Sequence, residues 1–198
     1  MIDDVALVDF IERRARDTAI VNVHTMAALT KGLHGDQMTE IGLLRDAGAV
    51  GFTDGVKAVA NAQLMRRVLS YAAHVGALVV QHAEEPALAT GVMNESELAG
   101  RLGLAGTPAI SETILIERDL RLPELTGGRY HVSQIACEAS VDIIRRAKTR
   151  GQLGGGRAHG DGHRCSGAGR DHVRRRRAGR QSAQRSHPRR GQKDRAKL

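Results

Sequence analysis

Residues 61–82 read NAQLMRRVLSYAAHVGALVVQH and join the two patterns that decide the fold. From Asn61 to Val75 the apolar residues recur with the 3.6-residue period of an amphipathic helix. Asn61 is a favourable N-terminal cap, and Gly76 is a typical residue at a helix C-terminus. Residues 77–81 are apolar on both faces, which is typical of a parallel strand that is covered on both sides. The stretch therefore predicts a helix that leads directly into a buried strand.

The same alternation runs through the first 150 residues. Further helices are predicted at residues 5–16, 39–47, 95–102, 110–120 and 140–150, and further strands at residues 19–25, 50–54 and 129–136. Such alternation indicates parallel strands joined by right-handed crossovers. A (β/α)8 barrel and an open doubly wound sheet both fit. The absence of a glycine-rich phosphate motif after any strand counts against a dinucleotide-binding fold.

We take the fold class as α/β, with residues 1–150 forming a partial (β/α)8 barrel, because four strands are about half of an eight-stranded barrel. The residues predicted to be buried are Val50, Phe52, Val79, Val80, Val132 and Ile135.

Residues 151–198 have a different composition. They carry 14 Lys/Arg, 3 Asp/Glu and ten glycines, but only Leu153, Val173 and Leu198 from the large aliphatic set. Such a segment cannot bury enough apolar surface to offset chain entropy, and it is predicted to be a disordered basic tail. It could be the out-of-frame product of a GC-rich gene, a solvated native tail or a nucleic-acid-binding arm. Because no aromatic residue is present there to stack on bases, nucleic acid is the weaker choice of partner and out-of-frame translation is favoured.

The net charge of +8 comes from this tail, since residues 1–150 carry 16 Lys/Arg and 19 Asp/Glu. Cys137 and Cys165 form no CxxC pair, so neither a disulfide framework nor a thiolate zinc site is indicated. The N-terminus is acidic, and no apolar run approaches the roughly 20 residues that span a bilayer. We expect a cytoplasmic protein that does not bind a membrane.

Polar residues that could bind a metal occur at the predicted strand ends. They are His24, Asp54, His82 with Glu84 and Glu85, and His131 with Gln134. The carboxyl ends of parallel strands meet at one edge of the sheet, where the chemistry of such proteins lies. Imidazoles and carboxylates together suit zinc. A single strand-end histidine is more often solvated or bonded to the backbone, but one candidate per strand–helix unit makes a metal site an equally good interpretation.

Four stretches then resemble dihydroorotases of the long, multifunctional-complex type, which belong to the amidohydrolase superfamily. They are VNVHTMAALTKGLHG, AVGFTDG, the run from ALVVQHAEEP to SETILIERDL, and LTGGRYHVSQIACEASVDIIRRAKTRG. The most specific part runs from His82 through residues 91–104 to residues 112–118. The resemblance implies zinc-dependent hydrolysis of a cyclic amide, the reversible interconversion of L-dihydroorotate and N-carbamoyl-L-aspartate in pyrimidine biosynthesis.

The resemblance also implies which residues bind the metal. His82 matches a metal-binding histidine, and Glu84 and Glu85 occupy the acidic position that usually follows it. The family's tandem aspartate reads Asp54-Gly55 here, so the expected metal ligands are His82 and, by a one-residue shift, Asp54. Gln134 stands where the family has a metal-binding histidine. An amide is a poor zinc ligand beside imidazole.

Other family residues are expected outside residues 1–150. An early His-x-His motif with a carboxylate-binding arginine belongs before residue 1, and a late catalytic aspartate belongs after Arg150. We therefore expect an N-terminally truncated and frameshifted fragment, assign it no catalytic residue and no organic-cofactor ligand, and expect it to be inactive. Two alternatives are a non-catalytic dihydroorotase-like partner of aspartate carbamoyltransferase and a basic nucleic-acid-binding protein that uses the tail.

Overall fold

The computed structural model describes residues 1–55 and 57–149. All of these residues belong to one compact unit, Met1–Gly160. The predicted tail at residues 151–198 lies outside the described residues, so its disorder and the domain boundary at residue 150 stay predictions.

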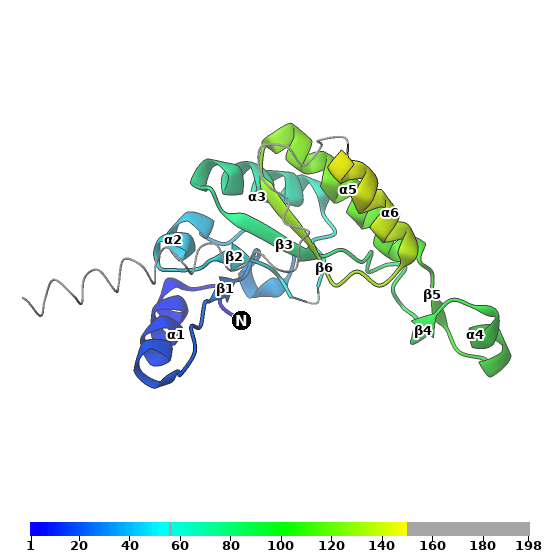
Figure 1. Ribbon diagram of the computed structural model, residues 1–198, viewed down its shortest axis with the longest axis horizontal. Coiled ribbons are helices and arrows are strands. Elements are labelled where there is room, and N and C mark those ends of the chain that lie inside the picture. The colour runs from blue at the N-terminus through cyan, green and yellow to red at the C-terminus, as the bar shows by residue number, and fades with distance from the viewer. Residues whose placement is uncertain (56, 150–198) are drawn as a thin grey trace, which may run out of the picture. The chain divides into compact units, whose positions relative to one another are not determined.

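The described residues alternate between helices and parallel strands (Figure 1). The helices are α1 (Val5–Thr18), the 3-10 helix η1 (Lys31–Leu33), α2 (Ile41–Asp46), α3 (Ala62–Val75), α4 (Glu97–Leu102), α5 (Ile110–Thr126) and α6 (Glu138–Thr149). The strands are β1 (Met26–Ala27), β2 (Gly51–Phe52), β3 (Leu78–His82), β4 (Met93–Asn94), β5 (Gly106–Thr107) and β6 (Arg129–Ser133). None of the helices within the described ranges has the length and apolar character to cross a bilayer.

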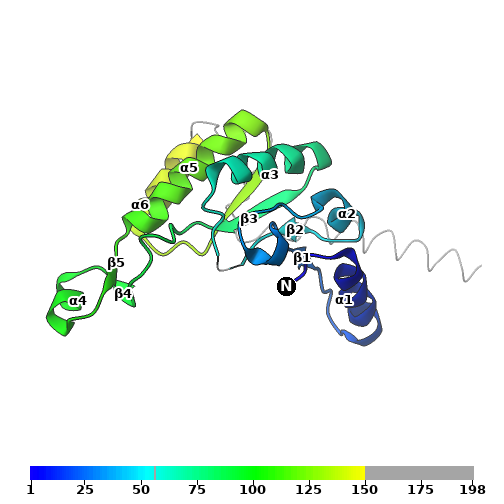
Figure 2. The same cartoon turned by 180° about the vertical axis from the view of Figure 1, so that it is seen from behind.

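Four strands form one sheet in the order β1-β2-β3-β6, and every neighbouring pair is parallel. In both views α3, α5 and α6 lie along the same side of β3 and β6 (Figures 1 and 2). Parallel strands with helices as crossovers are the repeating unit of a (β/α)8 barrel, and four such strands make part of one. The predicted fold class, α/β with a partial barrel, is confirmed.

Helix α3 shows why this sequence folds locally as predicted. The Asn61 side chain accepts hydrogen bonds from the N–H groups of Gln63 and Leu64, at 3.0 and 3.1 Å, and so caps the first turn. Gly76 ends the helix with φ of 70°, a conformation that costs glycine little because it has no Cβ. Five apolar side chains of α3 are buried: Leu64, Met65, Val68, Leu69 and Ala72.

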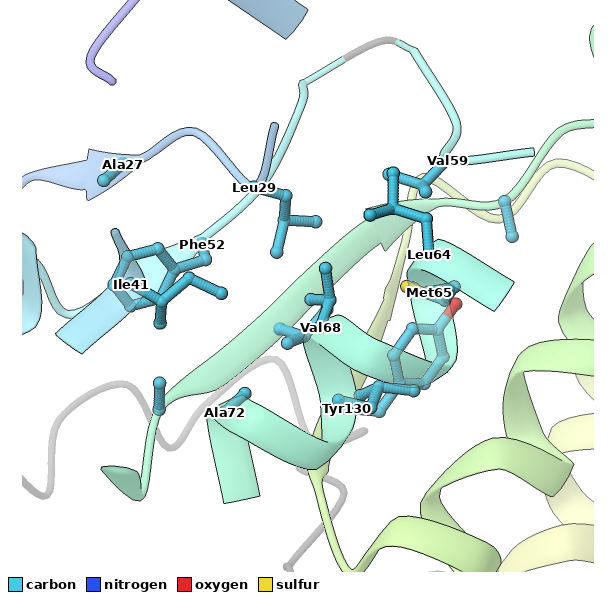
Figure 3. Close-up of a cluster of buried hydrophobic side chains, with 14 of the residues drawn as sticks. Ala27, Leu29, Ile41, Phe52, Val59, Leu64, Met65, Val68, Ala72 and Tyr130 are labelled. Atoms are coloured by element: carbon cyan, nitrogen blue, oxygen red, sulfur yellow. The ribbon is translucent and has the colours of Figure 1, made fainter. Parts of the chain in front are cut away.

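The core forms where this helix packs against one face of the sheet. Ala27, Phe52, Val79 and Tyr130 are register partners on the four strands, so they form a row on the same face, and each is at most 2% exposed. In Figure 3 the labelled side chains of Met65 and Val68 lie with Phe52 and Tyr130 in one apolar cluster. Burial of this row fixes the strand register, because a one-residue slip would turn each side chain to the other face.

Burial differs from the prediction at four of six positions. Phe52 and Val79 are buried as predicted, Val80 and Val132 are half-buried, and Val50 and Ile135 are 51% and 42% exposed. The prediction treated both faces of each strand as covered. Val80 follows Val79 and so faces away from α3. Val50 precedes β2 and Ile135 follows β6, so both lie outside the sheet.

The strand predicted at residues 19–25 is wrong. These β-branched residues follow α1 as irregular chain, with Ile20 fully exposed, and the sheet instead uses Met26–Ala27. Ala27, Ala28 and Leu29 are buried, so the small and apolar residues of the following stretch make the contact with the core. This shift moves His24 to the amino-terminal side of β1.

Between β3 and α5 the chain makes a small separate sheet in which β4 and β5 pair in parallel. The two strands approach so closely that a Cβ on Gly91 would lie 2.3 Å from the Gly106 carbonyl carbon, and one on Gly106 would lie 2.5 Å from Glu95 Cα. Both distances are far shorter than a van der Waals contact. The close approach of the two backbones therefore requires glycine at both positions.

Candidate functional site at the carboxyl ends of the strands

His82 is the last residue of β3 and stands at the edge of the sheet where function was predicted. It pairs in register with Ser133 of β6, and its side chain is 21% exposed. Its Nδ1 atom is buried and has no hydrogen-bond partner among the described residues. Its Nε2 atom is 4.0 Å from a carboxylate oxygen of Glu84. A buried ring nitrogen without a hydrogen-bond partner can bind a metal in the tautomer that leaves it unprotonated.

Asp54 follows β2 and is used differently. Its Oδ1 accepts hydrogen bonds from the N–H groups of Leu29 and Thr30, both at 2.9 Å, and its Oδ2 accepts from the Thr30 hydroxyl. The residue is 4% exposed. Asp54 thus holds the loop after β1 against the end of β2, and these bonds would have to rearrange for either oxygen to bind a metal. That it is a metal ligand stays a prediction.

Gly55 and Gln134, which the resemblance places at ligand positions, share a left-handed backbone. Gly55 has φ of 71° and open space within 4 Å of where a Cβ would stand. Gln134 has φ of 55° and follows the last residue of β6. Left-handed conformations are rare for most residues but several-fold more common for Asp, Asn and His. This backbone strains any side chain at position 55, but aspartate there and histidine at position 134 are tolerated better than most residues.

His131 lies on the same face of the sheet as His82. It pairs with Val80 in register, and Val80 and His82 face the same way because strand side chains alternate. The regular alternation of side chains along β6 ends at Ser133. It therefore does not tell on which side Gln134 lies relative to His131. His24, by contrast, is exposed and precedes β1, so the structure does not bring it to the carboxyl edge.

Glu112, on the first turn of α5, fixes the loop that carries Gln134. The carboxylate accepts hydrogen bonds from the N–H of Ala136 at 2.9 Å and of Cys137 at 3.3 Å, and the residue is 8% exposed. The thiol of Cys137 lies 3.4 Å from Glu112 Oε1 and 3.0 Å from the hydroxyl of Ser140. The sequence identifies Glu112 only as part of the stretch that resembles the family. The structure shows that its carboxylate binds the backbone of the loop after β6.

Asp119, seven residues and about two turns after Glu112 on α5, is fully buried. It accepts hydrogen bonds from the Tyr130 hydroxyl at 2.8 Å and from Gln81, the residue before His82, and it pairs with Arg118 at 2.7 Å. Burial raises the pKa of the Asp119 carboxyl above its ordinary value of 3.8, against the lowering by Arg118 and the hydrogen bonds. Burial, and secondarily the charge of Asp119, raises the pKa of Tyr130 well above 10.0, so the hydroxyl keeps its proton.

The donor set does not complete a zinc site within the described ranges. No three His, Cys, Asp or Glu side chains there are placed to hold one ion, whereas a catalytic zinc takes three protein ligands and an open position. The orphaned Nδ1 of His82 fits one of those ligands. The described residues therefore supply at most part of a zinc site.

Comparison with known proteins agrees with these observations. A model of the family described as dihydro-orotase-like matches residues 3–140. The dihydroorotase of Trichlorobacter lovleyi is 40% identical over 151 residues, which cover 76% of this chain and 36% of that protein. The dihydroorotase of Geotalea daltonii is 43% identical over 150 residues, covering 75% and 35%. The chain thus spans about a third of the length of these relatives.

Solved structures support the fold. The L-hydantoinase (dihydropyrimidinase) from Arthrobacter aurescens superposes with a TM-score of 0.58 at 22% identity, over 75% of this chain and 34% of that chain. A D-hydantoinase from a Bacillus species gives 0.53 at 18% identity, over 74% and 34%. With four parallel strands in one sheet and the family model matched over residues 3–140, this chain belongs to the dihydroorotase-like family.

Proposed function

We propose that this chain is part of a dihydroorotase, in which His82 is one of the zinc ligands. The reaction is the reversible hydrolysis of a cyclic amide: water adds its oxygen to the ring carbonyl carbon of L-dihydroorotate, the carbon–nitrogen bond breaks, and the nitrogen gains a proton to give N-carbamoyl-L-aspartate. The observation that carries the proposal is the buried, unbonded Nδ1 of His82 at the end of β3, inside the region that the family model matches.

The 198-residue chain by itself is proposed to be inactive and to hold less than one equivalent of zinc. His82 stands at the carboxyl edge, Asp54 is engaged in three hydrogen bonds, and Gln134 offers an amide in place of imidazole. If Asp54 is a ligand, its bonds to the β1 loop change when the metal binds. We place the protein in the cytoplasm of the cell, where pyrimidine biosynthesis supplies its substrate.

One experiment compares zinc content and dihydroorotate turnover in three purified proteins: this chain, its His82→Ala variant and the full-length dihydroorotase of Geotalea daltonii as positive control. We expect no turnover from the chain and a zinc content that falls further in the variant. Stoichiometric zinc with turnover in the unmodified chain would show that the inactivity proposed here is wrong. Equal zinc in the chain and in His82→Ala would remove His82 from the site.

A chimera tests the activity of the whole protein. The matching segment of the Geotalea daltonii enzyme is replaced by residues 3–140 of this chain, with or without Gly55→Asp and Gln134→His. We expect the double substitution to raise zinc affinity and turnover above the unsubstituted chimera, because both positions adopt the backbone that the restored residues tolerate. A chimera that binds zinc fully without either substitution would contradict the proposal.

The second candidate is a non-catalytic partner of aspartate carbamoyltransferase. Gln134 and Gly55 favour it, because loss of two ligand positions within the matched region is expected of a relative that no longer performs catalysis. Co-sedimentation with purified aspartate carbamoyltransferase separates the two: a stable complex, combined with chimeras that stay inactive after both substitutions, supports the partner role.

A further inference from the structure

Arg118 on α5 reaches the loop between β2 and α3. Its guanidinium donates to the carbonyl oxygen of Val59 at 2.8 Å and to that of Ala60 at 2.5 Å. Its side chain is 18% exposed, although the two segments are almost 60 positions apart in the sequence. Val59 is buried, so its carbonyl group needs a partner, whereas Ala60 is exposed; one planar guanidinium bonds both carbonyl oxygens.

Asp119 accepts a hydrogen bond from the same guanidinium, and this bond completes a closed ring of hydrogen bonds. Val59 donates its N–H to Gln81 Oε1 at 2.9 Å, and Gln81 donates its amide to Asp119 Oδ2. Asp119 Oδ1 accepts from Arg118 at 2.8 Å, and Arg118 returns to Val59. Every polar atom in this ring has its partner, as a buried charge pair requires if it is not to destabilise the fold.

The ring joins two strand ends that matter for the proposed site. The β2–α3 loop starts with Thr53, Asp54 and Gly55 directly after β2, and Gln81 is the residue before His82. Gln81 faces α5 because it is buried on the Val79 side of β3, so His82 faces the opposite way. We infer that Arg118 and Asp119 are positioning residues, which clamp the β2–α3 loop to β3 and thereby set where the Asp54–Gly55 end of β2 stands relative to His82. The inference rests on the proposed function only in taking these strand ends as the site.

Trypsin reports directly on this clamp, because Lys57 lies exposed within the β2–α3 loop. Arg101, exposed in α4, serves as an internal reference in the same digest. In Arg118→Met the two loop carbonyls lose a charged donor, so we expect cleavage after Lys57 to rise about tenfold relative to cleavage after Arg101. Arg121→Met, an exposed arginine one turn away on the same helix, should leave the ratio unchanged.

Arg118→Lys keeps the positive charge beside Asp119 but puts one ammonium nitrogen in place of three spread nitrogens, which cannot reproduce the geometry of all three contacts, so a smaller rise at Lys57 is expected. This variant decides the matter if Arg118→Met fails to fold. An unchanged Lys57 ratio, or an equal rise at Arg101 that accompanies a lower melting temperature, would overturn the inference, because the pair would then serve global stability alone.

The effect at the site itself is read by NMR from the imidazole Hε1 resonances. With Arg118→Lys the His82 resonance should move while that of exposed His24, before β1, stays in place. No movement at His82 would overturn the positioning role even if Lys57 becomes more accessible. Neither readout needs zinc or dihydroorotate turnover, so the inference and the proposed function can fail independently.

Discussion

Asp54 and Thr30 are joined by two hydrogen bonds, one from the Thr30 N–H at 2.9 Å and one from its hydroxyl, with the Leu29 N–H as a third donor to the same carboxylate. Thr30 lies in the loop after β1 and Asp54 lies two residues after β2, so the pair ties together the carboxyl ends of two neighbouring strands. The residue that the family resemblance names as a candidate ligand is therefore also the one that shapes the edge of the site.

The first prediction separates these two roles. Asp54→Ala should lower the free energy of unfolding by about 3 kcal/mol, because two buried N–H groups and a hydroxyl lose their acceptor. Asp54→Asn should cost only about 1 kcal/mol, because its amide oxygen can still accept from both N–H groups. Urea denaturation gives both values. A variant Asp54→Asn that keeps its stability but loses its bound zinc would instead identify the residue as a ligand.

How far the sequence predicts this structure depends on whether the signal is local. The boundaries of α3 follow from Asn61 and Gly76, because caps act within one turn. The first strand was placed wrongly, because the β-branched residues 19–25 have strand composition while the contact that makes a strand is with residues 51–52. The extension of α5 past Leu120 was also missed, since Pro123 lies buried within its last turns.

The hydrogen bonds among Gln81, Arg118, Asp119 and Tyr130 could not be predicted, because they join residues up to 38 apart through side chains on one buried face. Even so, Glu112 and Asp119 are seven residues apart and thus on one face of a helix, each a carboxylate among apolar neighbours. A charged residue on the apolar stripe of a predicted helix is the signal that could have drawn attention to both.

The second prediction concerns pH. The folded state raises the pKa of Asp119 above 3.8, so the folded protein binds this proton more tightly than the unfolded chain does. The contribution of this group to the unfolding free energy is therefore fully present below about pH 3.8 and declines as the pH rises through the folded pKa. Asp119→Asn should remove that decline. Urea titrations of both proteins across pH 3 to 8 measure the difference, and Asp36→Asn, an exposed site, should leave the parent's profile unchanged. If the difference in unfolding free energy between the parent and Asp119→Asn does not change with pH, the prediction is wrong.

The third prediction concerns the close approach of the two backbones at the β4–β5 pair. Gly106→Ala would place a methyl group 2.5 Å from Glu95 Cα, so the strands must separate, at a cost of about 1–3 kcal/mol. Hydrogen exchange should show this locally, as faster exchange of the Val92 and Glu95 amides that bond to Ala105 and Thr107. Gly100→Ala within α4 meets open space and is the matched control, expected to stabilise the helix slightly. Equal exchange in the two variants would mean that the β4–β5 pair accommodates a side chain at position 106.

The last prediction asks whether a side chain at position 134 can share a metal ion with His82. Gln134→His should be tolerated, because the residue has φ of 55° and histidine is among the residues that adopt this conformation more readily. If the restored imidazole joins His82 on one ion, zinc affinity should rise by about tenfold or more, the range by which single metal-site contacts change affinity. Competition with a chromophoric chelator measures it.

A double-substitution cycle and a matched control make this result specific. Gln134→Asn also suits the backbone but offers no imidazole, so its zinc affinity should equal that of the parent. Adding His82→Ala to Gln134→His should abolish the gain, since the gain comes from two ligands acting on one ion. Dihydroorotate turnover should stay absent throughout, because two imidazoles leave the site one protein ligand short of a catalytic zinc. If Gln134→His binds zinc no better than Gln134→Asn, the loop held by Glu112 presents position 134 away from His82, and the edge of this sheet does not bind zinc in the way proposed here.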